Sequence, residues 1–328
     1  MRRSPVGDRC PDRHHLLPGA HCGRLECSAD RRAKESHLLG VNSLSLTQRQ
    51  LVDSLVTELS AIDGVRTIVL GGSFARGCAR PDSDVDLGVL YDENGPFKIE
   101  ALRNLAARLN DHPKPVVTEF YEWGRWVNGG AWLTIQGQRV DVLYRSIQHY
   151  ERVIADAEAG RYEIDYEQQP PFGFFGPTYL GEVSTCETLF DPQGDLPRLK
   201  ERVAVYPEAL RLAVVRDCLW SVEFGLEAFA PKFALAGDVY GTAGCLARFA
   251  NRLVLALFAL NRVYFVSDKT AIAEIGEFKS APSFFGDRLQ AIFSRPGSSP
   301  AELSSAVESM SRLFREVIVL SDGLYAAR

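Results

Sequence analysis

The chain contains 328 residues, of which 46% are hydrophobic and 24% charged, with seven cysteines and a net charge of −5. This length and composition are typical of a soluble globular protein with about two domains, and the acidic balance argues against non-specific binding of long nucleic acids. Seven cysteines are too few, and odd in number, for a disulfide scaffold, so we expect a reduced, cytoplasmic protein; the longest apolar run, residues 253–260, is too short to cross a membrane.

Residues 1–40 form a distinct segment. They hold four of the six histidines, show little apolar periodicity and lack the apolar core of a signal peptide. We therefore expect a disordered extension or a misassigned start, with the native chain beginning near Val41. A zinc site is the alternative, but the spacing of its ligands would match no standard zinc motif. The residues concerned are Cys10, His14, His15, His21, Cys22 and Cys27.

A helix and a strand are the first regular elements. The helix is expected from Thr47, which would cap it, to about Ile62, because apolar residues recur at helical spacing. Asp63-Gly64 would then end it. The following run, residues 65–70, is short, apolar and β-branched, which predicts a buried strand.

A glycine-rich turn, Gly71-Gly72-Ser73, comes directly after this strand. Glycine readily adopts positive φ and lets the backbone approach a ligand closely. The Ser73 hydroxyl and the amides that follow, up to Gly77, are donors suited to phosphate oxygens. Arg76 lies inside this turn and would add a cation. The turn is not a Walker A loop, because Cys78-Ala79 stand where that motif requires Lys-Ser or Lys-Thr.

Three aspartates occur in strand-like runs. Asp84 and Asp86 are spaced i, i+2 in the expected strand 84–90, so both side chains point to the same face. Unpaired, these carboxylates would repel each other and lose hydration, whereas Mg²⁺ favours carboxylates together with substrate phosphates. Asp141 is the acid of a further strand-like run, 139–144, which a neighbouring position in the sheet would bring beside the pair. Two metal ions about 3.5–4 Å apart can clamp the attacking and leaving oxygens of an in-line displacement.

The rest of this region continues the mixed pattern. An amphipathic helix is expected over 97–110, a strand over 116–121 and a hairpin over 132–144 that carries Asp141. The Pro- and Gly-rich stretch 169–177 cannot be regular helix and predicts a boundary or an active-site flap.

From residue 196 onward the pattern is helical, with 3.6-residue apolar spacing over 207–230, 238–265, 283–294 and 299–320. Lys232 and Lys269 lie near expected helix ends and are candidates to neutralise a triphosphate, although a solvated lysine is the simpler interpretation of each.

In the first region, three tryptophans could stack a base or a substrate ring, or form core. They are Trp123, Trp126 and Trp132.

The motif Gly72-Ser73-Phe74-Ala75-Arg76-Gly77, followed by Ser83-Asp84-Val85-Asp86-Leu87, resembles the DNA polymerase β-like nucleotidyltransferase superfamily. The likeness is greatest to its small bacterial branch, which includes antibiotic and toxin nucleotidyltransferases, and is firm over 65–145. It implies that Gly72 and Ser73 hold the triphosphate of an NTP and that Asp84 and Asp86 bind metal. Asp141 would bind one metal or accept the proton of the attacking hydroxyl.

The resemblance also implies a fold and an activity. The fold would be α+β, with a polymerase β-like catalytic domain over residues 41–195 and a C-terminal helical bundle over 196–328. The activity would be Mg²⁺-dependent transfer of a nucleoside monophosphate from an NTP to an acceptor hydroxyl (EC 2.7.7 type), using two Mg²⁺ ions, with Arg76 and Lys269 contacting the nucleotide.

The identity of the acceptor is left open by the sequence. A small hydroxylated molecule, such as an aminoglycoside or lincosamide antibiotic, is the favoured acceptor. A toxin-type enzyme that acts on tRNA or on a protein would use the same mechanism. A degenerate member that only senses a nucleotide is the alternative from another class. No membrane is expected to take part.

Overall fold

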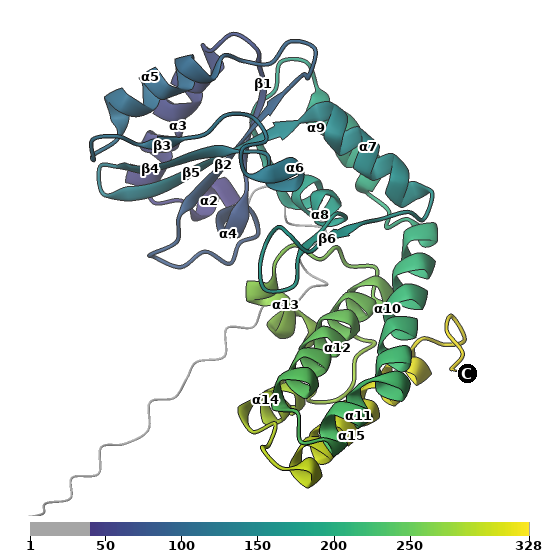
Figure 1. Cartoon of the computed structure of the whole chain (residues 1–328). Coiled ribbons are helices and arrows are strands. Elements are labelled where there is room, and N and C mark those ends of the chain that lie inside the picture. Colours follow the sequence, from purple (N-terminus) through teal and green to yellow (C-terminus); the bar gives the residue numbers. More distant parts are fainter. Residues whose placement is uncertain (1–39, 328) are drawn as a thin grey trace, which may run out of the picture.

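The structure is a computed structural model, and it describes residues 40–327 (Figure 1). The expected disordered extension or misassigned start, and the alternative zinc site, lie outside these residues. A mixed sheet with its helices fills one half of the molecule, and a group of longer helices fills the other (Figure 1). The expected α+β architecture with a helical C-terminal region is thus confirmed.

The sheet has six strands in the order β3-β4-β5-β2-β1-β8. Strands β2 and β5 pair in parallel, and the other neighbours pair antiparallel. Hydrophobic strands flanked by polar turns, as in the sequence, form the centre of this sheet. The strands are β1 (Val65–Leu70), β2 (Val85–Tyr91), β3 (Val116–Val117), β4 (Gly130–Ile135), β5 (Gln138–Ser146) and β8 (Glu187–Phe190).

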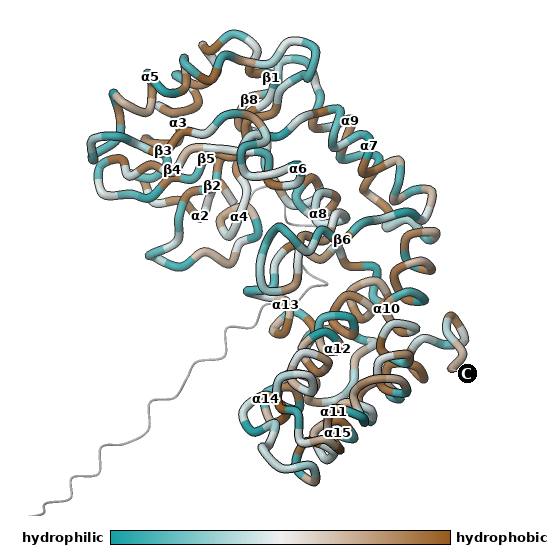
Figure 2. The backbone as a smooth tube through the Cα atoms, viewed as in Figure 1, coloured by the Kyte–Doolittle hydropathy of each residue, from teal (hydrophilic) through white to brown (hydrophobic). Residues whose placement is uncertain are grey.

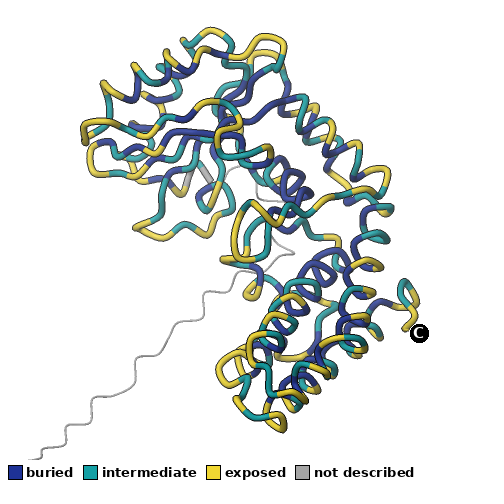
Figure 3. The backbone as a smooth tube through the Cα atoms, in the orientation of Figure 1, coloured by how far each residue is buried: buried dark blue, intermediate teal, exposed yellow. Residues whose placement is uncertain are grey.

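One face of the sheet packs against α3 (Leu46–Ser60) and α5 (Ile99–Leu109). Alternate residues of each strand point into this core, since side chains alternate between the two faces of a strand. On β2 they include Val85 and Leu87, so the residues between them face the other side of the sheet. Figure 3 shows these central strands as largely buried.

The start and the length of two elements differ from expectation. Helix α3 is capped by Ser45 rather than Thr47: the Ser45 hydroxyl accepts from the Gln48 amide, and the Gln48 side chain accepts from the Ser45 amide. Two orphan donors are satisfied by this capping box, which Thr47 within the first turn cannot provide. The expected strand 116–121 shortens to the two residues of β3, and Tyr121 takes a positive φ in the loop that follows.

Between the sheet and the helical region lies a segment that sequence patterns left largely unassigned. It contains α7 (Ile147–Glu158), α8 (Thr178–Thr185) and a small two-stranded sheet, β6 (Ile164–Asp165) with β7 (Phe174–Phe175). Phe174, in the expected boundary or flap, is buried against Trp126. This part of the stretch is therefore packed into the core.

The four long helices expected in the C-terminal region are present as α10 (Glu208–Ala228), α12 (Val239–Leu260), α14 (Phe285–Ser294) and α15 (Pro300–Leu320). Hydrophilic and hydrophobic residues alternate along α10, α14 and α15 (Figure 2), as one core-facing side requires, whereas residues 253–260 of α12 are all buried. Shorter helices complete the chain: α2 (Gly40–Ser43), α4 (Gly72–Ala75), α6 (Gly124–Val127), α9 (Asp195–Val203), α11 (Ala230–Leu235) and α13 (Asp268–Ile275).

Helix α12 is long and apolar enough to cross a membrane by length and composition. In this structure 61% of its most apolar window is buried inside the protein, and it packs between α10 and α15. Such burial is what the core helix of a globular domain shows. The core around α12 continues without a break into α7 and α8, so the helices that follow the sheet and the C-terminal helices are packed together.

Candidate functional site

Three aspartates share one face of the sheet. Asp86 on β2 is the direct register partner of Asp141 on β5, and Asp84 lies two residues before Asp86. Val85 and Val140, between or beside these acids, point to the opposite, buried face. The parallel pairing of β2 and β5 therefore brings together Asp86 and Asp141, which are 55 positions apart in the chain. The sequence predicted that their strands could be neighbours, but not that the two acids are register partners.

The glycine-rich turn lies against the same acids. It forms the single helical turn α4 directly after β1, and the Gly71 amide donates to the Asp86 carbonyl at 2.9 Å. Gly72 has φ of 59°, and a Cβ at this position would overlap the Asp86 carboxylate. Only glycine gives the turn this backbone conformation and this closeness to Asp86. Ser73, which is half-buried, follows, and the buried Phe74 anchors the turn in the core.

The electrostatics of the acids show how close they lie. Burial, then the charges of Asp141 and Asp84, raise the pKa of Asp86 to about 7, while Lys269 lowers it. Burial and the charge of Asp84 raise the pKa of Asp141 as well, against Arg139 and Lys269. The charge of Asp84 thus disfavours ionisation of Asp86 and Asp141, and the charge of Asp141 disfavours ionisation of Asp86, so that a bound cation would relieve this repulsion.

Arg139 is a neighbour of the acids that the sequence analysis missed. Its Nε lies 2.5 Å from Asp84 Oδ1, and its Nη2 donates to the Asp82 carbonyl at 2.9 Å. Arg139 stands two residues before Asp141, so the strand period that aligned the acids also places Arg139 on their face. The i, i+2 spacing of Arg139 and Asp141 could have identified Arg139 as a neighbour of the acids from the sequence.

The carboxylates are suited to a hard cation, but their oxygen atoms do not converge on one metal position. Among residues 40–327, no group of three or more His, Cys, Asp or Glu side chains forms a ready-made metal site. Asp84 Oδ1 is buried and accepts no hydrogen bond, although it faces Arg139 Nε. An acceptor in this state fits a cation, and Asp84, Asp86 and Asp141 are the residues that could hold one.

The two predicted nucleotide-binding cations have different surroundings. Lys269, at the start of α13, is close enough to influence both Asp86 and Asp141. Arg76 leaves the glycine-rich turn towards the same helix, where it donates to Thr270 Oγ1 at 2.9 Å and pairs with Glu274. Lys232 lies on α11, at the other end of the helical region (Figure 1). The helical region thus reaches the acids through α13.

The three tryptophans divide into core and surface. Trp126 is 5% exposed and packs against Phe174 and Tyr179, as the core interpretation expects. Trp132 is 51% exposed and stacks on Trp123 with ring centroids 4.2 Å apart.

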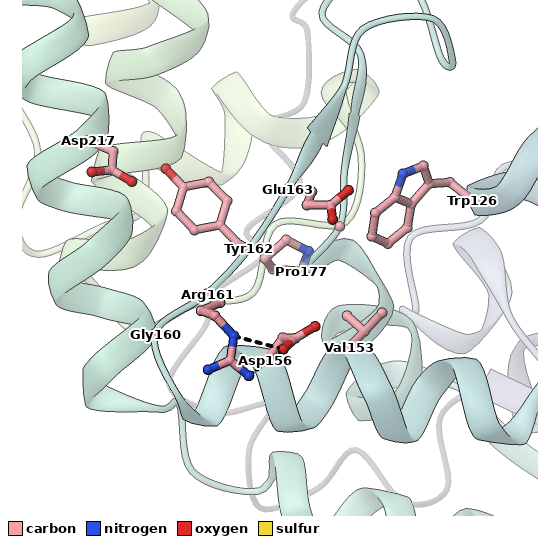
Figure 4. Close-up of a pocket in the computed structure, with 10 residues that line it drawn as sticks. Trp126, Val153, Asp156, Gly160, Arg161, Tyr162, Glu163, Pro177 and Asp217 are labelled. Atoms are coloured by element: carbon pink, nitrogen blue, oxygen red, sulfur yellow. Dashed lines mark hydrogen bonds and ion pairs between the residues drawn. The ribbon is translucent and has the colours of Figure 1, made fainter.

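A cavity of about 440 Å³ lies away from the acids and the glycine-rich turn, where the end of α7 and residues 160–163 face α10 (Figure 4). Asp156, Glu163 and Asp217 line it together with Arg161, which is ion-paired with Asp156. Of the candidate residues, Trp126 lines this cavity, whereas the three acids, the glycine-rich turn, Lys232 and Lys269 do not. The acids and the glycine-rich turn are therefore the candidate site.

Two family models match parts of the chain. Residues 52–162, which include the turn and all three acids, match the family model described as a nucleotidyltransferase domain. Residues 177–269 match a domain of unknown function, DUF4037. The chain is also similar to the solved structure of a nucleotidyltransferase-like protein from Exiguobacterium sibiricum 255-15. The alignment covers 84% of this chain and 77% of that protein, with 11% sequence identity and a TM-score of 0.42. No curated protein matches the chain.

Proposed function

We propose that this chain, which carries a nucleotidyltransferase domain of the DNA polymerase β-like superfamily, transfers a nucleoside monophosphate from an NTP to a hydroxyl of a small-molecule acceptor. The observation that supports this most directly is the placement of Asp84, Asp86 and Asp141 on one sheet face, beside the turn at Gly72 and Ser73. The family match supports nucleotide transfer in general, and the chemistry below is our proposal for this site.

The glycine-rich turn would bind the phosphates. Its backbone donors and the Ser73 hydroxyl follow β1, next to Asp86. Lys269 would add positive charge from α13, and Arg76 would do so from the turn itself. Positive charge at this place favours the pyrophosphate that leaves, because negative charge grows there as the bond to the α-phosphorus breaks.

Asp84 and Asp86 would hold two Mg²⁺ ions together with the triphosphate, with Asp141 as a further ligand or as the base. When bound, Mg²⁺ supplies positive charge that stabilises the phosphoryl group in transfer and lowers the repulsion among the acids. Its binding at Asp84 requires that the carboxylate turn from Arg139, since the two are now paired.

The reaction is a substitution at the α-phosphorus. The acceptor hydroxyl oxygen forms a bond to this phosphorus, and the bond to the bridging oxygen of the pyrophosphate breaks. In the role of base, Asp141 would take the hydroxyl proton; burial and the charge of Asp84 raise its pKa in the metal-free protein, which supports this role. The products are the nucleotidylated acceptor and pyrophosphate.

The test is pyrophosphate release with each NTP and Mg²⁺, against kanamycin, lincomycin and bulk tRNA. We expect release with a small acceptor and a loss of about 100-fold or more in kcat for Asp84→Asn, because metal-ligand charge contributes several kcal/mol to such transition states. Asp82→Asn is the matched control, since Asp82 is an exposed turn residue.

Two outcomes would contradict the proposal. If Asp84→Asn released pyrophosphate at the wild-type rate, the acids would not have the metal-binding role proposed for them. Nucleotide binding without pyrophosphate release, with every acceptor in the panel, would favour the nucleotide-sensor alternative.

A further inference from the structure

The row of side chains on the open sheet face continues past the acids to a tryptophan. Asp141 on β5 is the register partner of Asp86 on one side and of Trp132 on the other. Paired residues of neighbouring strands point to the same face, with Cβ atoms about 4.5–5.5 Å apart. Asp86, Asp141 and Trp132 therefore form a line across β2, β5 and β4.

Trp132 belongs to a preformed flat surface. Trp123 stacks on it with the two ring planes inclined by 26°. A Cβ at Gly130 would crowd the Trp123 ring, so the missing side chain gives Trp123 its place on the sheet. The loop that holds Trp123 is fixed by Asn128, whose carbonyl accepts from the Trp123 amide and whose Oδ1 accepts from the Tyr121 amide, each at 2.9 Å.

Strand alternation turns Trp132 to the open face of the sheet. The adjacent residues Ala131 and Leu133 point to the opposite face and are buried in the core, whereas half of the Trp132 surface faces solvent. A large aromatic surface that is exposed but held rigid is typical of a binding surface.

The order of the strands gives this surface a place in the reaction. The glycine-rich turn follows β1, on one side of β2, and Trp132 lies on β4, beyond β5 on the other side. The acids thus lie between the proposed phosphate-binding turn and the tryptophans. Since the attacking and leaving oxygens of the transfer lie roughly in line, the acceptor would approach from the side opposite the pyrophosphate, which is the side of Trp132.

The charges around the tryptophans favour one class of acceptor. Asp141 flanks Trp132, and the exposed Glu122 directly precedes Trp123. Two nearby arginines are already paired with acids, Arg139 with Asp84 and Arg125 with Glu163 and Asp165. A polyanionic nucleic acid would meet carboxylates here, whereas a cationic, hydroxylated ring would be attracted.

We propose that Trp132, supported by Trp123, is the binding surface for the acceptor, and that its ligand is the ring of a small, cationic, polyhydroxylated molecule of the amino-sugar class. The inference rests on the proposed transferase function for its orientation. Stacking on Trp132 holds the ring so that a hydroxyl beside it points to Asp141.

Equilibrium binding tests this without turnover. Kanamycin and lincomycin are titrated calorimetrically into the wild-type chain and into Trp132→Ala, Trp132→Phe and Trp220→Ala. Trp220 is the matched control, because it is 47% exposed and also stacked on an aromatic ring, Phe224, but lies on α10. We expect at least one probe to bind, Trp132→Ala to weaken it about tenfold or more, Trp132→Phe to retain most affinity, and Trp220→Ala to match wild type.

A non-hydrolysable ATP analogue, titrated into the same variants, should bind equally to all of them. The proposal is overturned if neither probe binds the wild type, if Trp132→Ala binds them normally, if it loses the ATP analogue instead, or if bulk tRNA is the ligand that depends on Trp132. Because these titrations need no reaction, Trp132-dependent probe binding without any pyrophosphate release would count against the proposed function alone.

Discussion

Asp86 lies where an ionised carboxylate is unfavourable, because burial and the charges of Asp141 and Asp84 raise its pKa to about 7. In the unfolded chain the pKa returns to its usual value of about 4. Between these two values the folded protein binds more protons than the unfolded chain. The stability associated with protonated Asp86 is therefore complete below about pH 4 and is lost as the pH rises to about 7.

Asp86→Asn should for this reason stabilise the metal-free protein at high pH. We expect the Tm of the variant to exceed that of the wild type by a few degrees at pH 8 in a chelator, corresponding to about 2 kcal/mol, and to differ little at pH 4.5. Thermal unfolding at both pH values measures this, with Asp82→Asn as the control. Equal destabilisation of Asp86→Asn at both pH values would refute the electrostatic interpretation.

Helix α13 is the element through which the helical region meets the candidate site. Arg76 of the glycine-rich turn is only 15% exposed at its side chain and contacts Thr270 and Glu274 of α13, one helical turn apart. Lys269, at the start of the same helix, is close enough to lower the pKa of Asp86 and Asp141. The ion pair thus fixes both the turn and the helix that presents Lys269.

Glu274→Gln should loosen α13 without unfolding the protein. The change leaves the guanidinium of Arg76 partly buried with a weaker partner. We expect faster hydrogen exchange of the α13 amides and an increase of about three- to tenfold in the KM for NTP, with a smaller change in kcat. Glu316→Gln is the control, since Glu316 pairs with Arg288 between α14 and α15. A lower KM would instead mean that Glu274 competes with phosphate for Arg76.

Local sequence patterns predicted the elements that have strong periodicity. The two motif strands, the hairpin with Asp141 and the four long C-terminal helices were all expected, because apolar spacing and turn residues determine them locally. The pairing of Arg139 with Asp84, the alignment of Trp132 with Asp141 and the contact of Arg76 with α13 were not. The pairing of Arg139 with Asp84 and the contact of Arg76 with α13 depend on strand pairing or helix docking between distant segments, which local patterns do not encode, and the alignment of Trp132 with Asp141 depends on the register of the hairpin. The roles of the site residues stay predictions.

At the scale of the whole molecule, the acids lie between two cores. One core joins the sheet to α3 and α5, and the other runs from α7 and α8 through the C-terminal helices. The second core also includes Val69 of β1 and Leu90 of β2, on the same face of the sheet as Asp86. A nucleotide held by the glycine-rich turn and Lys269 would therefore contact both halves of the molecule.

Such a ligand should stabilise both halves together. With Mg²⁺ and a non-hydrolysable ATP analogue at about 100 times the dissociation constant, we expect a single unfolding transition stabilised by about 2.7 kcal/mol, or several degrees in Tm. Lys269→Ala should lose much of this shift at the same ligand concentration, whereas Lys232→Ala, on α11, should retain it. Differential scanning calorimetry measures both the shift and the number of transitions. If the ligand raised the Tm of Lys269→Ala as much as that of the wild type, or if it split the unfolding into two transitions, the nucleotide would be bound by the sheet half alone, and α13 would have no part in holding it.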